Sequence, residues 1–203
     1  MLIQAKYHEI REDIQDGDII AFGGKGMTSN LIKLFTRSNV SHVALIMKAK
    51  LDNSNPLNMI IESTTLDGYS GVVINRLSNR LKDYQGEAWW LPLRQDLRSR
   101  GNWDEAYEWL KAQKRKAFDP MQAIGAGLDL LLNNKEDFDK FFCSELCCAF
   151  FEEKEIIKAI NSSEVTPIDL CMFNLYEDNY YQICGEEKEI QGYNILEPGE
   201  WVI

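Results

Sequence analysis

The feature that most constrains the fold is a pair of strand-like runs in the first third of the chain. Residues 40–47 are rich in branched side chains, and a second run of the same character covers residues 57–64 after a polar loop. Both are typical of β-strands. Alternate side chains of a strand share one face, so two antiparallel neighbours of this length would set His42 and Glu62 side by side.

The rest of the 203-residue chain mixes strand and helix signals. We expect short strands at 19–22, 72–74, 88–93 and 180–184, helices at 103–116 and 143–160, a further helix at 121–132 and a closing strand within 190–203. Residues 1–16 indicate only a charged lead-in. Without an internal repeat or a linker, residues 1–203 are predicted to form one domain of mixed strands and helices.

Charge and cysteine usage exclude several classes of protein. A formal net charge of -10 argues against a nucleic-acid or anionic-membrane partner, and it favours a neutral or cationic substrate. No signal peptide or membrane-spanning run is recognisable. The five cysteines are an odd number without a disulfide or zinc pattern, which is typical of a reducing cytoplasm. We therefore predict a cytoplasmic protein without a cofactor or metal; the sequence does not give the oligomeric state.

Cys143 is the strongest candidate for a nucleophile, because it lies where a helix is expected to begin. From there onward, apolar residues recur at the spacing of one buried helix face. The N–H groups and the positive dipole end of a first turn favour a thiolate, which is the reactive form of cysteine. The alternative is a structural thiol, since free cysteine is among the most buried residue types. Four other cysteines are interpreted as core residues, Cys147, Cys148, Cys171 and Cys184.

A cysteine nucleophile usually needs a base, and the chain has two histidines. His8 lies in the lead-in, whereas His42 lies on a predicted core strand and is the better candidate, although a histidine on a strand is more often structural. A third group normally orients the imidazole. Glu62, a carboxylate inside an apolar run, fits that role, and its alternative is a solvent-facing edge residue.

Together these segments resemble the circularly permuted papain-like hydrolases of the NlpC/P60 superfamily, particularly the YiiX/YaeF-like amidases. The resemblance covers about residues 17–170 and rests on five blocks: Gly17-Asp18-Ile19-Ile20, Ser41-His42-Val43-Ala44-Leu45, Ile61-Glu62-Ser63, Phe142-Cys143-Ser144-Glu145-Leu146 and Thr166-Pro167-Ile168-Asp169-Leu170. It implies an α+β fold with an antiparallel sheet packed against helices. It also implies that Cys143 is the nucleophile, His42 the base and acid, and Glu62 the orienting group.

One position departs from the family pattern. Family members resemble one another in a Tyr-Asp pair ahead of the cysteine block, whose hydroxyl is thought to assist the oxyanion hole. The matching residues here are Phe118 and Asp119. Phenylalanine has no hydroxyl, and one lost oxyanion donor costs about a hundredfold in rate or more. The segment between Asp119 and Cys143 is a candidate lid or substrate wall.

Three functions remain open at this point. The first is a cysteine amidase or peptidase that cleaves a small peptide, amide or cell-wall-derived substrate through an acyl-enzyme. The second is a lipid acyltransferase or thioesterase-like enzyme of the same fold, although the chain lacks the Asn-Cys-Glu-His block of such relatives and an apolar tail. The third is a non-catalytic binding module that retains the fold.

Overall fold

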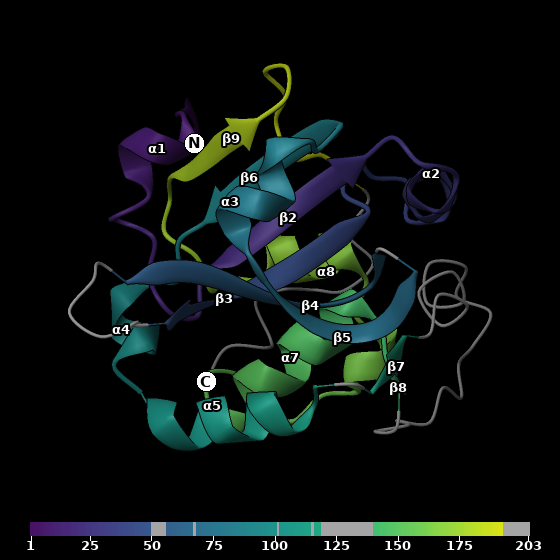
Figure 1. Ribbon diagram of the computed structural model, residues 1–203. Coiled ribbons are helices and arrows are strands. Elements are labelled where there is room, and N and C mark those ends of the chain that lie inside the picture. The colour runs from purple at the N-terminus through teal and green to yellow at the C-terminus, as the bar shows by residue number, and fades with distance from the viewer. Residues whose placement is uncertain (50–55, 67, 101, 115, 119–139, 193–203) are drawn as a thin grey trace.

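The computed structural model describes residues 1–49, 56–66, 68–100, 102–114, 116–118 and 140–192. Within them a seven-stranded sheet runs in the order β1-β9-β6-β2-β3-β4-β5 (Figure 1). Its strands are β1 (Leu2–Gln4), β2 (Ile19–Gly24), β3 (His42–Ala49), β4 (Leu57–Leu66), β5 (Tyr69–Arg76), β6 (Gly86–Leu91) and β9 (Tyr180–Cys184). The two predicted strand runs are thus confirmed as the neighbours β3 and β4.

The sheet is mixed rather than wholly antiparallel. Five of its neighbouring pairs are antiparallel, but β1 pairs with β9 in parallel, with Ile3 opposite Tyr181. The expectation of an antiparallel sheet is therefore corrected at one edge. The edge strand β1 and its neighbour β9 come from opposite ends of the chain, so no hairpin constrains their relative direction. The α+β class stands, and the permuted papain-like topology remains a prediction.

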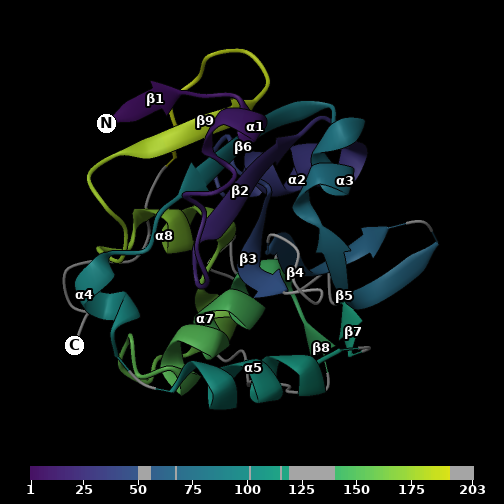
Figure 2. The same cartoon turned by 60° about the vertical axis from the view of Figure 1, so that its left-hand side comes forward.

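Helices cover both faces of this sheet. On one face lie α7 (Cys143–Glu153) and α8 (Pro167–Met172), with α5 (Trp103–Ala112) packed beyond α7; on the other lie α1 (Tyr7–Ile10) and α3 (Leu77–Lys82) (Figures 1 and 2). The other helical elements of the described residues are α2 (Met27–Phe35), α4 (Gln95–Arg98) and a 3-10 turn at Ser162–Glu164. None of the described helices is long and apolar enough to cross a membrane.

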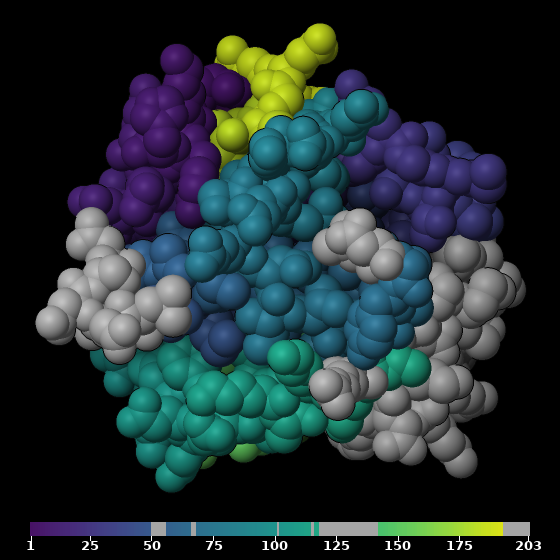
Figure 3. All heavy atoms as spheres, in the orientation of Figure 1, coloured from purple at the N-terminus to yellow at the C-terminus, as the bar shows by residue number. Residues whose placement is uncertain are grey.

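Two apolar cores follow from strand alternation. Val43 and Leu45 of β3 face the larger core with α7, whereas Ala44 and Ile46 face the smaller core with α3. Figure 3 views the molecule from the α3 side, where β5 and α3 occupy the middle of the surface. Both faces of the sheet are therefore buried, and a residue at the start of β3 lies between two sets of neighbours.

The lead-in is more ordered than the sequence indicates. Residues 1–16 form β1 and α1, and Ile14 is completely buried in the smaller core. The prediction of a poorly specified segment is therefore wrong. Its few apolar residues suffice because β1 pairs with β9, which supplies backbone hydrogen bonds that no local pattern reveals. The predicted helix at 121–132 lies outside the described residues, as does most of the predicted strand at 190–203.

A two-stranded parallel sheet precedes α7. It pairs β7 (Ala117–Phe118) with β8 (Lys140–Phe141), and Phe118 lies opposite Phe141. The helix α7 then begins at Cys143, as predicted, but ends at Glu153 rather than near residue 160. Glu155 adopts a positive φ of 58°, which an α-helix does not allow, so the chain turns there.

Candidate active site

The first turn of α7 holds Cys143 in a fixed, buried position. Phe142 is the N-cap residue, and its backbone N–H donates to Glu145 Oε2 at 3.2 Å. The hydroxyl of Ser144 donates to the carbonyl of Val165 at 2.6 Å, which ties the same turn to the 3-10 segment. The N–H of Cys143 belongs to the first helical turn, where no carbonyl of the helix accepts it. The helix thus presents a thiol beside backbone donors.

His42 is the first residue of β3 and lies across from Phe22 of β2. The two rings are 5.6 Å apart between centroids. The imidazole Nε2 bonds Glu62 Oε2 at 2.7 Å. Because Glu62 takes Nε2, Nδ1 is the ring nitrogen left for Cys143, which lies close enough to raise the pKa of His42. His42 therefore connects a carboxylate on one side to a thiol on the other.

The electrostatics of His42 favour its charged form. Burial acts to lower the pKa of His42, but the negative charge and hydrogen bond of Cys143, together with Glu62, raise that pKa to about 9. An imidazolium at neutral pH stabilises a thiolate beside it. His42 is therefore charged at neutral pH, with the thiol of Cys143 beside it.

Glu62 lies on β4 and is completely buried. The β3–β4 register pairs Leu45 with Ile61, and its continuation places Glu62 two residues along the strand from the position opposite His42. The predicted proximity therefore holds as a diagonal contact on one face. The expectation of a solvent-facing carboxylate is excluded by the burial. Such a burial is stable only when the carboxylate is paired and hydrogen-bonded.

Two residues that the sequence did not single out supply the remaining bonds of Glu62. Asn75 Nδ2 donates to Glu62 Oε1 at 3.2 Å, and Arg80 Nε donates to the same oxygen at 3.2 Å. Burial acts to raise the pKa of Glu62, but His42, Arg80 and Asn75 together lower it below its usual value. The carboxylate is therefore fixed in its ionised form.

Arg80 is itself positioned by aromatic rings. Its guanidinium carbon lies 5.1 Å from the ring centroid of Phe22 and 5.2 Å from that of Tyr84. Asn75 could have been found from strand alternation, because β5 pairs Val73 with Glu62 and puts Asn75 diagonally on the same face. Nothing in the short polar segment of α3 points to Arg80, since its contact depends on how α3 folds back over the sheet.

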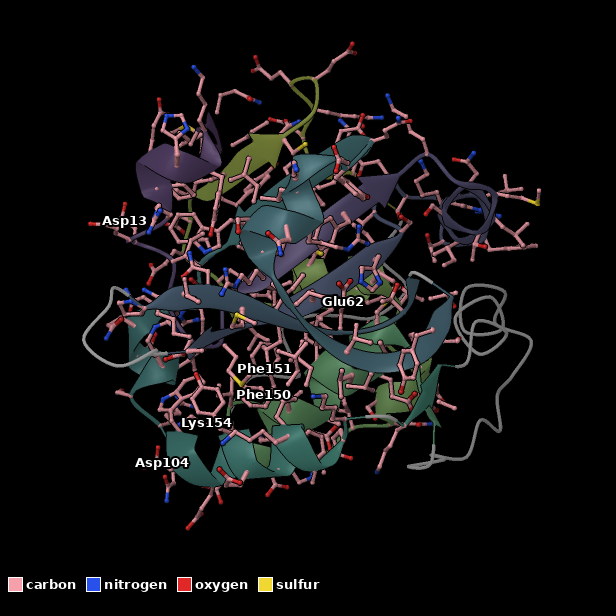
Figure 4. All side chains as sticks on the ribbon, viewed as in Figure 1. Asp13, Glu62, Asp104, Phe150, Phe151 and Lys154 are labelled. Atoms are coloured by element: carbon pink, nitrogen blue, oxygen red, sulfur yellow. The ribbon has the colours of Figure 1, made fainter. Side chains whose placement is uncertain are left out.

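Elements far apart in the sequence thus meet at the start of β3. Cys143 belongs to the core on the α7 face, while the neighbours of Glu62 lie on the α3 face. Figure 4 shows Glu62 on the sheet above Phe150 and Phe151 of α7. His8, the other histidine, is exposed on α1, where Glu9 Oε1 lies 3.9 Å from its Nε2. The structure therefore brings together Cys143, His42 and Glu62, and leaves His8 apart.

The position of Phe118 is settled for its backbone alone. Phe118 pairs with Phe141, two residues ahead of Cys143, so the backbone of β7 lies close to the start of α7. The side chain of Phe118 lies outside the described set, as do Asp119 and the residues up to 139. The predicted loss of an oxyanion hydroxyl, and the predicted lid, stay predictions.

A pocket of about 320 Å³ opens beside His42. It lies between α2, the start of β3, the end of β4 and the α3 region, and its described lining is Thr28, Ser29, Ile32, Ser41, His42, Thr64, Thr65, Arg80 and Tyr84. Pockets that bind small molecules begin at about this size. A ligand in this space would contact the imidazole directly.

Among the described residues, no group of three or more His, Cys, Asp or Glu side chains is arranged to hold a metal ion. No protein-family model matches the chain, and no curated protein matches it. A similar solved structure is the metalloprotein YiiX of Escherichia coli O157:H7, with 19% sequence identity and a TM-score of 0.47. The match covers 69% of this chain and 66% of the YiiX chain, which is slightly under two thirds of the length of YiiX.

Proposed function

We propose that the protein is a cysteine hydrolase that cleaves an amide bond through an acyl-enzyme on Cys143. The observation that carries the proposal is the chain of contacts from a buried, ionised carboxylate through His42 to a thiol at a helix start. A nucleophile, a base and a group that orients the base are the components of a covalent hydrolase.

The reaction follows from the positions of the protons. The Cys143 thiolate attacks the amide carbonyl carbon, and the carbonyl electrons move to oxygen. When the intermediate collapses, the C–N bond breaks and His42 gives its Nδ1 proton to the leaving amine. Neutral His42 then takes a proton from water, whose oxygen attacks the thioester. The acid leaves, and the thiolate and the imidazolium are restored.

The first turn of α7 supplies one donor to the oxyanion. The N–H of Cys143 points out of the helix start, and the dipole of α7 favours negative charge there. Glu62 takes no proton in this scheme. It holds the imidazole through Nε2, so that Nδ1 faces the thiol, and its ionised state supports the imidazolium.

Trapping the acyl-enzyme tests the proposal. The chain is mixed with a panel of N-acyl amides and short peptides, quenched in acid, and examined by peptide mass spectrometry. We expect an acyl mass on Cys143, hydrolysis of the same substrate, and loss of both in Cys143→Ala and His42→Ala. A matched control is Cys147→Ala, which removes a buried thiol one turn further along α7.

Three outcomes would contradict hydrolysis by Cys143. An acyl mass that passes to an added alcohol or amine but not to water would indicate an acyltransferase. An acyl mass on Cys147 or Cys148, or turnover that survives Cys143→Ala, would remove Cys143 from the reaction.

A further inference from the structure

The side chains that line the pocket beside His42 differ in charge from the chain as a whole. The protein carries a formal net charge of -10, yet no carboxylate lines this pocket among the described residues. Its two ionisable cations are His42 and Arg80, and most of its other lining groups are hydroxyls. Long-range repulsion from the net charge is screened within about 10 Å at ordinary salt, whereas contacts inside a pocket are not. The local groups therefore decide which ligands bind.

Arg80 is suited to bind an anion in this pocket. One of its five donors, Nε, is used by Glu62, and the side chain also lines the pocket. Its side chain is 17% exposed, and the rings of Phe22 and Tyr84 hold the guanidinium in place. An arginine fixed in this way loses little conformational freedom on binding, and its planar fork matches a carboxylate.

The pocket lies on the leaving-group side of the reaction. His42 lines it, whereas Cys143 is not among its described lining residues. In the proposed mechanism His42 protonates the leaving amine, so the part of the substrate that departs lies against the imidazole, while the acyl part lies on the thiol. A group in this pocket is therefore attached to the nitrogen of the scissile amide.

We infer that the substrate is an N-acyl amino acid, or a peptide cut at its last residue, whose free carboxylate is bound by Arg80. The inference rests on the proposed function and adds the substrate class to it. A volume of about 320 Å³ has room for one small amino acid and its carboxylate. Hydrolysis would release a free amino acid from this pocket. The expectation of a neutral or cationic substrate, which rested on net charge alone, is replaced by this local argument.

The test uses the Cys143→Ala chain, which binds but cannot react, so its outcome does not depend on the chemistry. N-acetylglycine and N-acetylglycinamide differ only in the carboxylate. Both are titrated at pH 7 while the Arg80 Nε–H signal and the backbone amides of the pocket are followed by NMR. We expect N-acetylglycine to bind at least about tenfold more tightly than the amide, which is the usual size of a charge-assisted hydrogen bond.

Arginine variants in the same background provide the controls. Arg80→Gln should weaken the binding of N-acetylglycine by about tenfold, and Arg80→Lys should keep part of the preference for the acid over the amide. Arg76→Gln should leave the binding of N-acetylglycine unchanged. Arg76 is the matched control because it lines a different pocket, around Asn58. Equal binding of the acid and the amide overturns the inference even if the Arg80 variants fail to fold. Inorganic phosphate that binds as tightly as N-acetylglycine, or no binding of N-acetylglycine, overturns it as well.

Failure of the proposed function would be seen in the reactivity of Cys143 in the unmodified chain. An unreactive Cys143 in the unmodified chain contradicts the hydrolase, whatever the Cys143→Ala chain binds. A reactive Cys143 together with equal binding of acid and amide contradicts the substrate class alone.

Discussion

Two of the carboxylates buried among the described residues are each paired with an arginine, and their surroundings differ. Asp18 and Glu62 are both completely buried, and their partners are Arg98 and Arg80. Asp18 receives its hydrogen bonds from groups with no role in proton transfer. Glu62 has one partner, His42, that can gain and lose a proton.

Asp18 joins four parts of the chain. Its carboxylate accepts from the N–H groups of Gln15 at 2.7 Å and Leu93 at 2.8 Å, from the indole of Trp90 at 2.8 Å, and from Arg98 at 2.6 Å. Burial raises the pKa of Asp18, and Arg98 with the two backbone donors opposes that effect. The preceding Gly17 has a φ of 84°, and an added Cβ would lie 2.4 Å from Trp103. This cluster fixes the entry into β2.

The contrast separates a buried acid with a structural role from a buried acid that belongs to the candidate active site. The Gly-Asp block and the Ile-Glu-Ser block both contribute to the resemblance to the permuted hydrolases, and both contain a buried acid. Only Glu62 contacts a residue that contacts a thiol. We therefore expect Asp18 to affect stability alone, and Glu62 to affect both stability and the reactivity of Cys143.

The largest expected effect is on folding. Asp18→Asn leaves the charge of Arg98 buried without its partner, which costs about 3–5 kcal/mol in the free energy of unfolding. Urea unfolding measures this cost, with Asp96→Asn as the matched control because Asp96 pairs with Arg94 on the surface. We expect the control to leave the urea midpoint unchanged. A cost for Asp18→Asn below about 1 kcal/mol would show that the cluster is not structural.

The next largest effect is on the reactivity of Cys143, and it should differ between the Glu62 and Asp18 variants. Glu62→Gln keeps the shape but removes the charge that supports the imidazolium, so alkylation of Cys143 by iodoacetamide at pH 6 should slow by about ten- to a hundredfold. In Asp18→Asn, measured under conditions where the variant stays folded, Cys143 should be alkylated at the rate seen in the unmodified chain. Equal slowing in both variants would mean that the comparison fails and that burial alone sets the reactivity.

A pH effect on stability follows from His42. Its pKa in the folded chain, about 9, lies above the ordinary value of 6.5. Folding stabilises the charged form of His42. Its contribution to the free energy of unfolding is therefore complete below pH 6.5 and is lost as the pH rises through about 9. The stability advantage of the unmodified chain over His42→Gln should therefore shrink across this window, by at most about 1.4 kcal/mol per pH unit. An advantage that grows with pH would contradict an imidazolium at this site.

The smallest effect concerns Asn75. Its uncharged amide donates to the ionised Glu62, and we expect about 1 kcal/mol of that bond to reach the thiol, so Asn75→Ala should slow alkylation of Cys143 by about fivefold. The control is Asn58→Ala on the neighbouring strand, whose amide bonds Tyr7 and Arg11 instead. A larger effect from Asn58→Ala than from Asn75→Ala would indicate that the sheet as a whole, rather than the bonds of Glu62, governs the thiol.

Local patterns were enough to predict the parts of the site that lie on regular elements. Alternation on β3 and β4 puts His42 and Glu62 on one face, and the apolar period after Cys143 indicates where α7 begins. These three residues do converge in the structure. Their roles in a reaction, and the extent of the domain, stay predictions.

The contacts that the sequence did not reveal depend on tertiary packing. Arg80 reaches Glu62 because α3 returns over the sheet, and Arg98 reaches Asp18 across 80 residues. The strand β1 forms because β9 offers an edge 178 residues away. No local signal encodes which distant partner satisfies a buried charge or an edge strand, so such pairs appear only when the fold is known.

The most direct test of the central claim is the pH dependence of iodoacetamide alkylation at Cys143, followed by peptide mass spectrometry in the unmodified chain and in His42→Ala. Cys147 serves as the internal control, because burial raises the pKa of the Cys147 thiol. We predict that Cys143 reacts at pH 6 to 7, well below the ordinary thiol pKa of about 8.5, that His42→Ala loses this reactivity, and that Cys147 stays unlabelled. A Cys143 that is inert in both chains, or equally reactive in both, would contradict a thiolate supported by His42.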